Sequence, residues 1–275
     1  MIDIPVFLQF AFLGAIIASI SSGIMGSFVV IKRISSITGS ISHSILAGIG
    51  IFEYLSHTYD IPWLDPMLGA VVAGLISAFL IGYVHLNFKQ KEDAVIAIIW
   101  SVGMAIGIIF LSFVPHKEAT CTHFLFGDLF TTGRADILIL SILAFFIVSL
   151  TILFYRKFLI ICFDEEAAYL QKIFVKTFYF LLLAMISISI VLLVKIIGII
   201  LIIALLTIPA TIANFFTYRL PVMMIIAVIL SMLFNTIGIT FSYLLSWPPG
   251  ATIAIVVSIF YLIALLTKKL MYRLE

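Results

Sequence analysis

The chain has 275 residues, of which 64% are hydrophobic and only 10% are charged, and its net charge at pH 7 is +2. A soluble domain carries about 25% charged residues, so this composition excludes a soluble globular protein and indicates a polytopic membrane protein. The basic residues stand between apolar segments and form no single patch, which argues against a nucleic-acid partner.

Apolar segments of about 20 residues recur along the whole chain, and each is long enough to cross a bilayer as a helix. The first follows no positively charged n-region, so we expect a retained helix and not a signal peptide. The second is short, and 175–217 is divided only at Lys195, so eight spans is the alternative to nine. Residues 1–275 are predicted to form a single all-α transmembrane domain. The expected spans are 6–30, 39–56, 65–86, 94–114, 136–155, 175–193, 197–217, 221–244 and 250–267.

Lysine and arginine are distributed unevenly between alternate connections of these spans. Of the 15 basic residues, only Lys117, Arg134 and Lys195 fall in one set of connections, and all others fall in the alternate set. Cytoplasmic loops carry the positive excess in membrane proteins. The distribution therefore predicts an N-terminus outside the cell and a C-terminus inside it.

The stretch SITGSISHSILAGIGI, residues 36–51, holds one histidine among glycines, serines and alanine. At about 100° per residue, its small residues and the histidine share one face of the expected helix. Such a face lets another helix approach closely or leaves room for a narrow path. An imidazole inside a membrane suggests a functional role, and neutral imidazole is a good ligand for zinc. A packing role for this histidine near the inner interface is the alternative. The face consists of Ser36, Gly39, Ser40, His43, Ala47 and Gly50.

The outer connection at 115–136 is the longest polar segment on its side. It holds five residues of types that ligate metals, but their spacing matches no closed zinc pattern. We favour a polar outer loop over a metal site. The five residues are His116, Glu118, Cys121, His123 and Asp128.

The inner connection at 156–176 carries three consecutive acidic residues directly before two alanines. This order is typical of the acidic first turn of a helix. A short cytosolic helix between spans would suit docking on a soluble partner, and a solvated hairpin is the equal alternative. The residues are Asp164, Glu165, Glu166, Ala167 and Ala168.

Gly198 and Pro209 interrupt the apolar segment 195–216. Proline removes one backbone hydrogen bond from a helix, and broken helices often line substrate paths, although a plain kink is the alternative. Asn235, in the eighth span, is a second polar residue for such a path, or for contact with another helix.

The chain lacks the motifs that would let it act alone. It contains no phosphate-binding loop for ATP and no catalytic motif of a protease or hydrolase, so we expect no enzyme activity. Acidic residues are almost absent from the spans, whereas ion-coupled transporters use buried carboxylates. We therefore expect another subunit to supply the energy.

Five segments in chain order carry a family resemblance: VIKRISSITGSISHSILAGIGI at 30–51, FLFGDLF at 124–130, CFDEEAAYLQ at 162–171, KIIGIILIIALLTIPATIANFF at 195–216 and SYLLSWPPGATIAIVV at 242–257. Together they resemble the membrane permease subunits of the zinc, manganese and iron ABC importer family, the ZnuB-like proteins. The resemblance runs nearly from end to end.

The resemblance implies a fold like that of the vitamin B12 type importers and a location in the bacterial cytoplasmic membrane. It implies a dimer of this permease, two cytosolic ATP-binding ABC subunits and an extracytoplasmic metal-binding protein. The segment 158–174 would couple the permease to the ATPase. No stably bound cofactor is implied, because the divalent metal is the transported substrate.

Ser42 and His43 match the serine and histidine of the family pattern Asp-x-x-Ser-His, but Gly39 stands at the aspartate position. A carboxylate there would share one cavity with the imidazole and hold the metal jointly. Its absence points to a transient contact through His43, and favours zinc while leaving manganese and iron open. The other expected path residues are Ser36, Gly39, Ser40, Ala47, Gly50, Pro209 and Asn235.

The sequence thus predicts metal import by alternating access at the interface of two copies of this chain. A permease of the same architecture for a larger chelate, of the siderophore or cobalamin type, is the alternative. An ion-coupled secondary transporter is the more distant rival.

Overall fold

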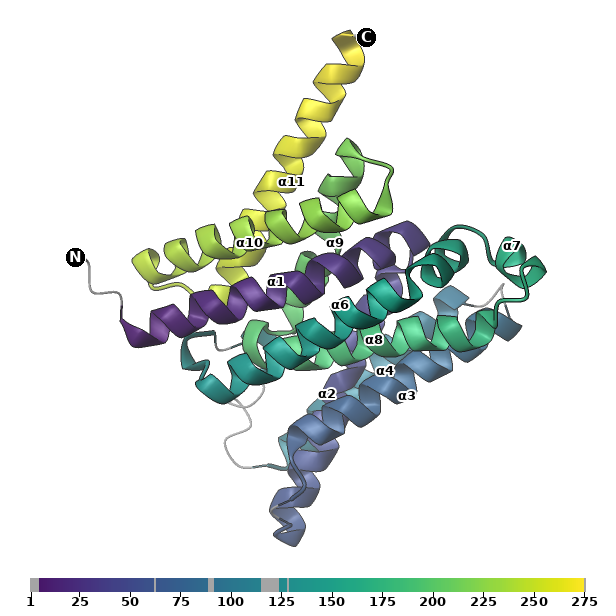
Figure 1. Cartoon of the computed structure of the whole chain (residues 1–275). Coiled ribbons are helices and arrows are strands. Elements are labelled where there is room, and N and C mark those ends of the chain that lie inside the picture. Colours follow the sequence, from purple (N-terminus) through teal and green to yellow (C-terminus); the bar gives the residue numbers. More distant parts are fainter. Residues whose placement is uncertain (1–4, 62, 89–91, 115–123, 128, 275) are drawn as a thin grey trace. The chain divides into compact units, whose positions relative to one another are not determined.

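The computed structural model describes residues 5–61, 63–88, 92–114, 124–127 and 129–274. Within these ranges the chain is built from helices and contains no strand (Figure 1). The elements are α1 (Val6–Lys32), α2 (Ser35–Tyr59), α3 (Pro66–Asn87), α4 (Glu92–Ser112), η1 (Leu129–Thr131), α6 (Arg134–Phe163), α7 (Glu165–Leu170), α8 (Val175–Ile197), α9 (Ile199–Phe216), α10 (Leu220–Leu245) and α11 (Pro249–Leu274).

Nine helices in the described ranges are long and apolar enough to cross a membrane, namely all except α7 and η1. The prediction of an all-α polytopic membrane protein with nine spans is therefore confirmed. The chain divides between α8 and α9 at Gly198, whose φ of 83° is readily adopted only by glycine. Lys195, where we expected the division, lies in the last turn of α8.

Several helices extend beyond the spans expected from hydrophobicity, α2 and α6 among them. α6 continues past residue 155 through Arg156 and Lys157 to Phe163, because residues 158–163 are again apolar and Phe158 and Ile161 are fully buried. α2 begins before residue 39, and Ile37 and Thr38 in its first turn are buried. Packing there compensates for the weak hydrophobicity that made the span look short.

The chain forms two compact units. The first comprises Met1–Arg33, Phe126–Ile152 and Lys195–Glu275, and the second comprises Ile34–Leu125 and Leu153–Val194. Helices α6 and α8 each contribute residues to both units. The single transmembrane domain stays a prediction.

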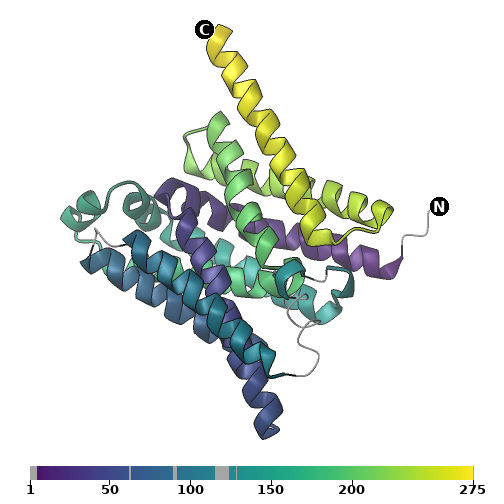
Figure 2. The same ribbon diagram turned by 180° about the vertical axis from the view of Figure 1, so that it is seen from behind.

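In the second unit, α2 packs against both α3 and α4, and the three helices lie side by side in both views (Figures 1 and 2). Glycines make these contacts close. A Cβ atom on Gly48 would strike the carbonyl oxygen of Gly69 in α3, and one on Gly50 would lie 2.5 Å from the carbonyl oxygen of Gly107 in α4. The helices therefore meet backbone to backbone, the arrangement that small residues permit in membranes.

In the first unit, α1 packs against α9 and α10, and α11 packs against the same two helices. Gly23 of α1 faces Val228 of α10, and Gly26 abuts the backbone at Leu206 of α9. A methyl group at either glycine would meet main-chain atoms of the neighbouring helix. These two glycines of α1 therefore allow α9 and α10 to pack closely against it.

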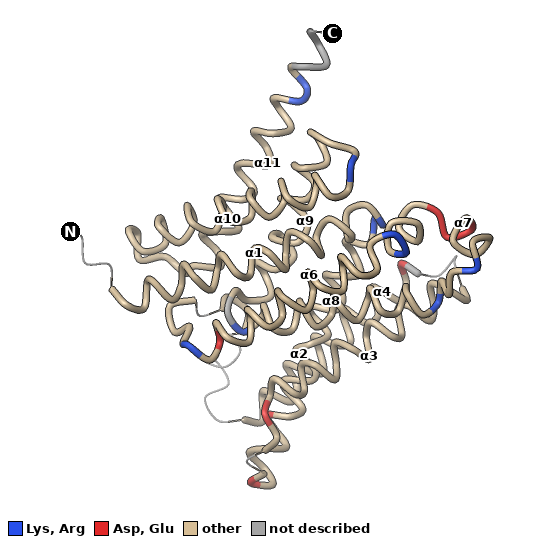
Figure 3. The backbone as a smooth tube through the Cα atoms, in the orientation of Figure 1, with Lys and Arg blue, Asp and Glu red and all other residues tan. Residues whose placement is uncertain are grey.

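Charged residues are concentrated at the ends of the helices, and most of the length of each span is free of them (Figure 3). The acidic residues of α7 stand out beside the basic residues that flank that helix (Figure 3). This pattern is typical of helices whose middle turns lie in hydrocarbon.

Candidate functional site

His43 lies in α2, where its imidazole stacks on the indole of Trp100 from α4. The ring centroids are 4.7 Å apart and the planes are inclined by 17°. His43 Nδ1 is buried and has no hydrogen-bond partner among the described residues, while the side chain as a whole is only half-buried. An imidazole with an unpartnered nitrogen retains the capacity to accept a proton or to ligate a metal.

The small-residue face around His43 is largely covered by α4. A Cβ atom at Gly39 would lie 2.7 Å from Cζ3 of Trp100. The hydroxyl of Ser40 donates a hydrogen bond to the carbonyl of Ile96 at 2.9 Å. Gly50 packs against Gly107 in the same way. This part of the face therefore forms a close contact between α2 and α4, and does not line an open path.

The remaining residues of that face have different surroundings. Ser36 is exposed in the first turn of α2. Ala47 borders a groove of about 330 Å³ between α3 and α4, lined almost entirely by apolar side chains such as Ile76 and Val102. The six residues predicted from the helical wheel therefore do not form one open channel wall within this unit.

Pro209 and Asn235 belong to the other unit. α9 runs without a break from Ile199 to Phe216, so Pro209 does not divide it as its position in the sequence suggested. Asn235 is 1% exposed, and its Nδ2 donates to Ser19 Oγ at 2.9 Å and to the carbonyl of Ala15 at 3.3 Å. It therefore joins α10 to α1 inside the unit.

The acidic segment forms a capped helix, as its order of residues predicted. Asp164 is the N-cap of α7, and its Oδ1 accepts hydrogen bonds from the backbone N–H groups of Glu166 at 2.9 Å and Ala167 at 3.0 Å. Ala168, in the same helix, is fully buried. The cap satisfies two of the orphan donors at the start of a helix too short to be stable alone.

His85, at the end of α3, holds α7 in place. Its Nε2 lies 3.2 Å from Oε1 of Glu165, and its ring stacks on Tyr179 of α8 with centroids 4.8 Å apart. Sequence reasoning missed both His85 and Trp100. No local pattern marks either residue, because each acts through a helix distant in sequence.

Three large apolar side chains at the end of α7 and just after it are exposed. Tyr169, Leu170 and Phe174 are 77%, 81% and 77% exposed, and they border a groove of about 700 Å³ together with Glu165 and Glu166. Exposed apolar side chains of this size on a segment between two spans indicate a contact surface.

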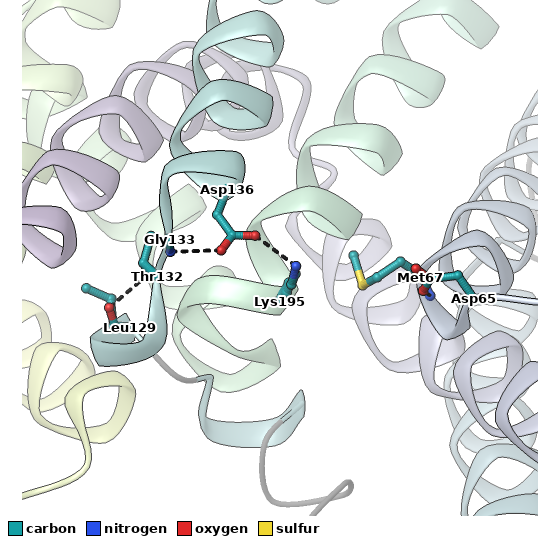
Figure 4. Close-up of polar contacts among 7 residues, drawn as sticks. All are labelled: Asp65, Met67, Leu129, Thr132, Gly133, Asp136 and Lys195. Carbon is teal, nitrogen blue, oxygen red and sulfur yellow. Dashed lines mark hydrogen bonds and ion pairs between the residues drawn. The ribbon is translucent and has the colours of Figure 1, made fainter. Parts of the chain in front are cut away.

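The pair Lys195–Asp136 joins the end of α8 to the start of α6, as Figure 4 shows. Lys195 Nζ lies 2.8 Å from Asp136 Oδ1, and Asp136 Oδ2 accepts a hydrogen bond from the backbone N–H of Gly133 at 3.0 Å. Within the described residues, no group of three or more His, Cys, Asp or Glu side chains forms a metal cluster. The potential ligands of the outer loop, His116, Glu118, Cys121, His123 and Asp128, lie outside the described residues.

The sequence profile of the ABC 3 transport family matches residues 5–268. The chain belongs to the ABC 3 transport family. The resemblance drawn from five sequence segments is thereby confirmed.

Relatives in this family share most of the chain. A protein of Chlamydia pneumoniae named "Probable metal transport system membrane protein" is 40% identical over 94% of this chain and 88% of its own length. The manganese transport system membrane protein MntC of Halalkalibacterium halodurans is 31% identical over 94% of this chain and 86% of its own. The solved structure of PsaBC from Streptococcus pneumoniae in complex with Fab superposes with a TM-score of 0.82, at 29% identity, over 94% of this chain and 91% of that one.

A further structure, described as a metal-chelate type ABC transporter in an inward-facing conformation, matches with a TM-score of 0.73 over 94% of this chain and 85% of that chain. Its identity to this chain is 13%, so this match shows the fold alone. ABC 3 family membership and an ABC permease fold therefore rest on independent comparisons.

Proposed function

We propose that this ABC 3 family chain is the membrane permease subunit of an ATP-driven importer for a divalent transition metal. The observation that carries the proposal is the family match over residues 5–268, together with relatives named for metal and manganese transport. The chain contains no phosphate-binding loop, so ATP hydrolysis belongs to a separate cytosolic subunit and this chain is no enzyme.

Transport would proceed by alternating access at the interface of two copies of this chain. An extracytoplasmic metal-binding protein would deliver the metal on the outer side, and two ATP-binding subunits would switch the path inward. The Lys and Arg distribution supports an N-terminus outside and a C-terminus inside the cytoplasmic membrane of a bacterium.

His43 is the proposed transient metal ligand, with Ser36, Gly39, Ser40, Ala47, Gly50, Pro209 and Asn235 as further path residues. A half-buried imidazole with an unpartnered nitrogen supports this role. Within the described residues it belongs to no group of three or more His, Cys, Asp or Glu side chains, which fits a metal bound weakly enough to be released. We place zinc first because imidazole suits zinc, with manganese and iron as the other substrates to be tested.

The ATP-binding subunit would dock on α7 and the exposed apolar residues beside it. Two features support this: the capped helix with exposed Tyr169, Leu170 and Phe174, and the His85–Glu165 contact that ties α7 to α3. Movement of the ATPase would pass through α7 into the α2–α3–α4 group, which carries His43.

The test is metal accumulation in cells that depend on this importer. His43→Ala is expected to reduce the uptake of one of zinc, manganese or iron at unchanged protein level. The matched control is His57→Ala, because His57 is an exposed histidine of the same helix. Unchanged accumulation of all three metals in His43→Ala would remove the ligand role, and uptake of a metal chelate alone would replace the proposed substrate class.

Purified chain in liposomes provides a second test. Uptake is expected only when the ATP-binding subunit and ATP are present. Uptake by the chain alone, driven by an ion gradient, would overturn the importer assignment in favour of a secondary transporter.

A further inference from the structure

Trp100 occupies the space beside His43 that a side chain at position 39 would enter. Position 39 precedes His43 by one helical turn, so a side chain there would face the same space as the imidazole. The nearest non-local atoms to a Cβ atom at Gly39 are three atoms of the Trp100 ring, at 2.7, 3.0 and 3.6 Å. A carboxylate at this position would collide with the indole.

The same indole also orients the imidazole. The two rings are stacked nearly parallel, which restricts rotation of the His43 ring about its own axis. α4 is held beside α2 on both sides of this contact, by the Ser40–Ile96 hydrogen bond and by Gly103 packed on Ser44. The backbone of α4 is therefore held beside α2 one turn on either side of Trp100, which places the indole against His43 and Gly39.

We propose that Trp100 is the specificity-determining residue of the metal path: it fixes the His43 imidazole and bars a carboxylate from position 39. The passing ion would meet one nitrogen ligand and no anionic oxygen on this turn of α2. Such a site favours zinc over harder ions such as manganese. This inference rests on the proposed function, in which His43 contacts the transported metal.

Two substitutions of Trp100 distinguish the effect of the aromatic ring from the effect of side-chain size. Trp100→Phe retains an aromatic face for His43 and is expected to keep the zinc concentration for half-maximal uptake within about twofold of the parent. Trp100→Leu keeps an apolar side chain but loses the stack, and is expected to raise that concentration by about 10-fold, the lower end of the loss when an orienting partner of a metal ligand is removed. Trp63→Ala, which removes a 72% exposed tryptophan, is the control.

A double-mutant cycle tests the exclusion of the carboxylate. Gly39→Asp alone is expected to lower the yield and the melting temperature of the complete transporter, because the indole has no space for the new side chain. In Gly39→Asp with Trp100→Ala, the loss of melting temperature is expected to be smaller than the sum of the losses in the two single variants, and the ratio of zinc to manganese uptake is expected to shift toward manganese. A general loss of packing would not change that ratio.

Failure of this inference is distinguishable from failure of the proposed function. Parental folding and metal preference in Gly39→Asp with Trp100 present would overturn it, and so would equal zinc uptake by Trp100→Leu and Trp100→Phe. If the double variant does not fold, the Leu and Phe variants still decide. If His43→Ala transports normally, the proposed ligand role itself has failed, whatever the Trp100 variants do.

Discussion

Replacing His85 is expected to loosen α7 while the spanning helices stay folded. α7 has only the six residues Glu165–Leu170, too few for independent stability. One tertiary contact of α7 is that of Glu165 with His85, which in turn is stacked on Tyr179. His85→Ala removes both the polar contact and the ring.

The size of the effect follows from these two contacts. The side chains of His85 and Glu165 are 19% and 25% exposed, so their pair is worth about 0.2–1 kcal/mol. The stack on Tyr179 adds about 0.5–1.5 kcal/mol. A sum of about 1–2 kcal/mol raises the opening equilibrium of α7 by a factor of about 5–30. His85→Phe keeps a ring on Tyr179 and loses the contact with Glu165, so its expected factor is about 2–5.

Hydrogen exchange of the full chain, followed by mass spectrometry, measures this opening directly in peptides that cover 164–171. Exchange there is expected to accelerate by the factors above, in the order His85→Ala, His85→Phe, parent. Peptides from α10 should exchange as in the parent. Glu166→Gln is the control, because Glu166 is an exposed neighbour of Glu165. Parental exchange in His85→Ala, or an equal acceleration in Glu166→Gln, would refute the anchoring role of His85.

Two further predictions concern docking and packing. Glu166→Lys should weaken co-purification of the ATP-binding subunit, because this exposed side chain borders the groove beside α7; parental co-purification and ATPase coupling would make α7 an ordinary connection. Gly48→Ala should lower the melting temperature by several degrees, because its methyl group collides with Gly69 and overpacking costs about 1–3 kcal/mol. Gly133→Ala is the control, since a Cβ atom there meets only Asp136 Oδ2 at 3.8 Å, and equal melting temperatures would contradict the glycine contact.

Features that depend on neighbouring residues in the sequence were predicted well. The nine spans follow from the lengths of apolar segments, and the start of α7 follows from an acidic run before alanines, which Asp164 caps. Gly198 was expected to interrupt the apolar segment 195–216, and the structure has the division there, with a φ of 83° that glycine adopts easily. Each of these signals is local and requires no knowledge of the other helices.

The environment of His43 was not predictable in the same way. The helical wheel correctly grouped the small residues with the histidine, but the same pattern allowed either an open path or a close helix contact. The structure has α4 over Gly39, Ser40 and Gly50, while Ala47 borders an apolar groove. Likewise, Pro209 stands inside an unbroken α9, because a proline in a span is tolerated where neighbouring groups satisfy the freed backbone.

By itself, the sequence determined that this protein is an all-α membrane protein and, through five segments in order, to which family it belongs. Composition and local periodicity suffice for these conclusions, because a bilayer accepts only helices or closed barrels and each span must be apolar over its own length. Only the tertiary structure decided that Trp100 covers Gly39 and stacks on His43, and that His85 anchors α7. Those contacts join residues far apart in the chain, and in a nearly uniform apolar sequence no local signal specifies which helix faces meet.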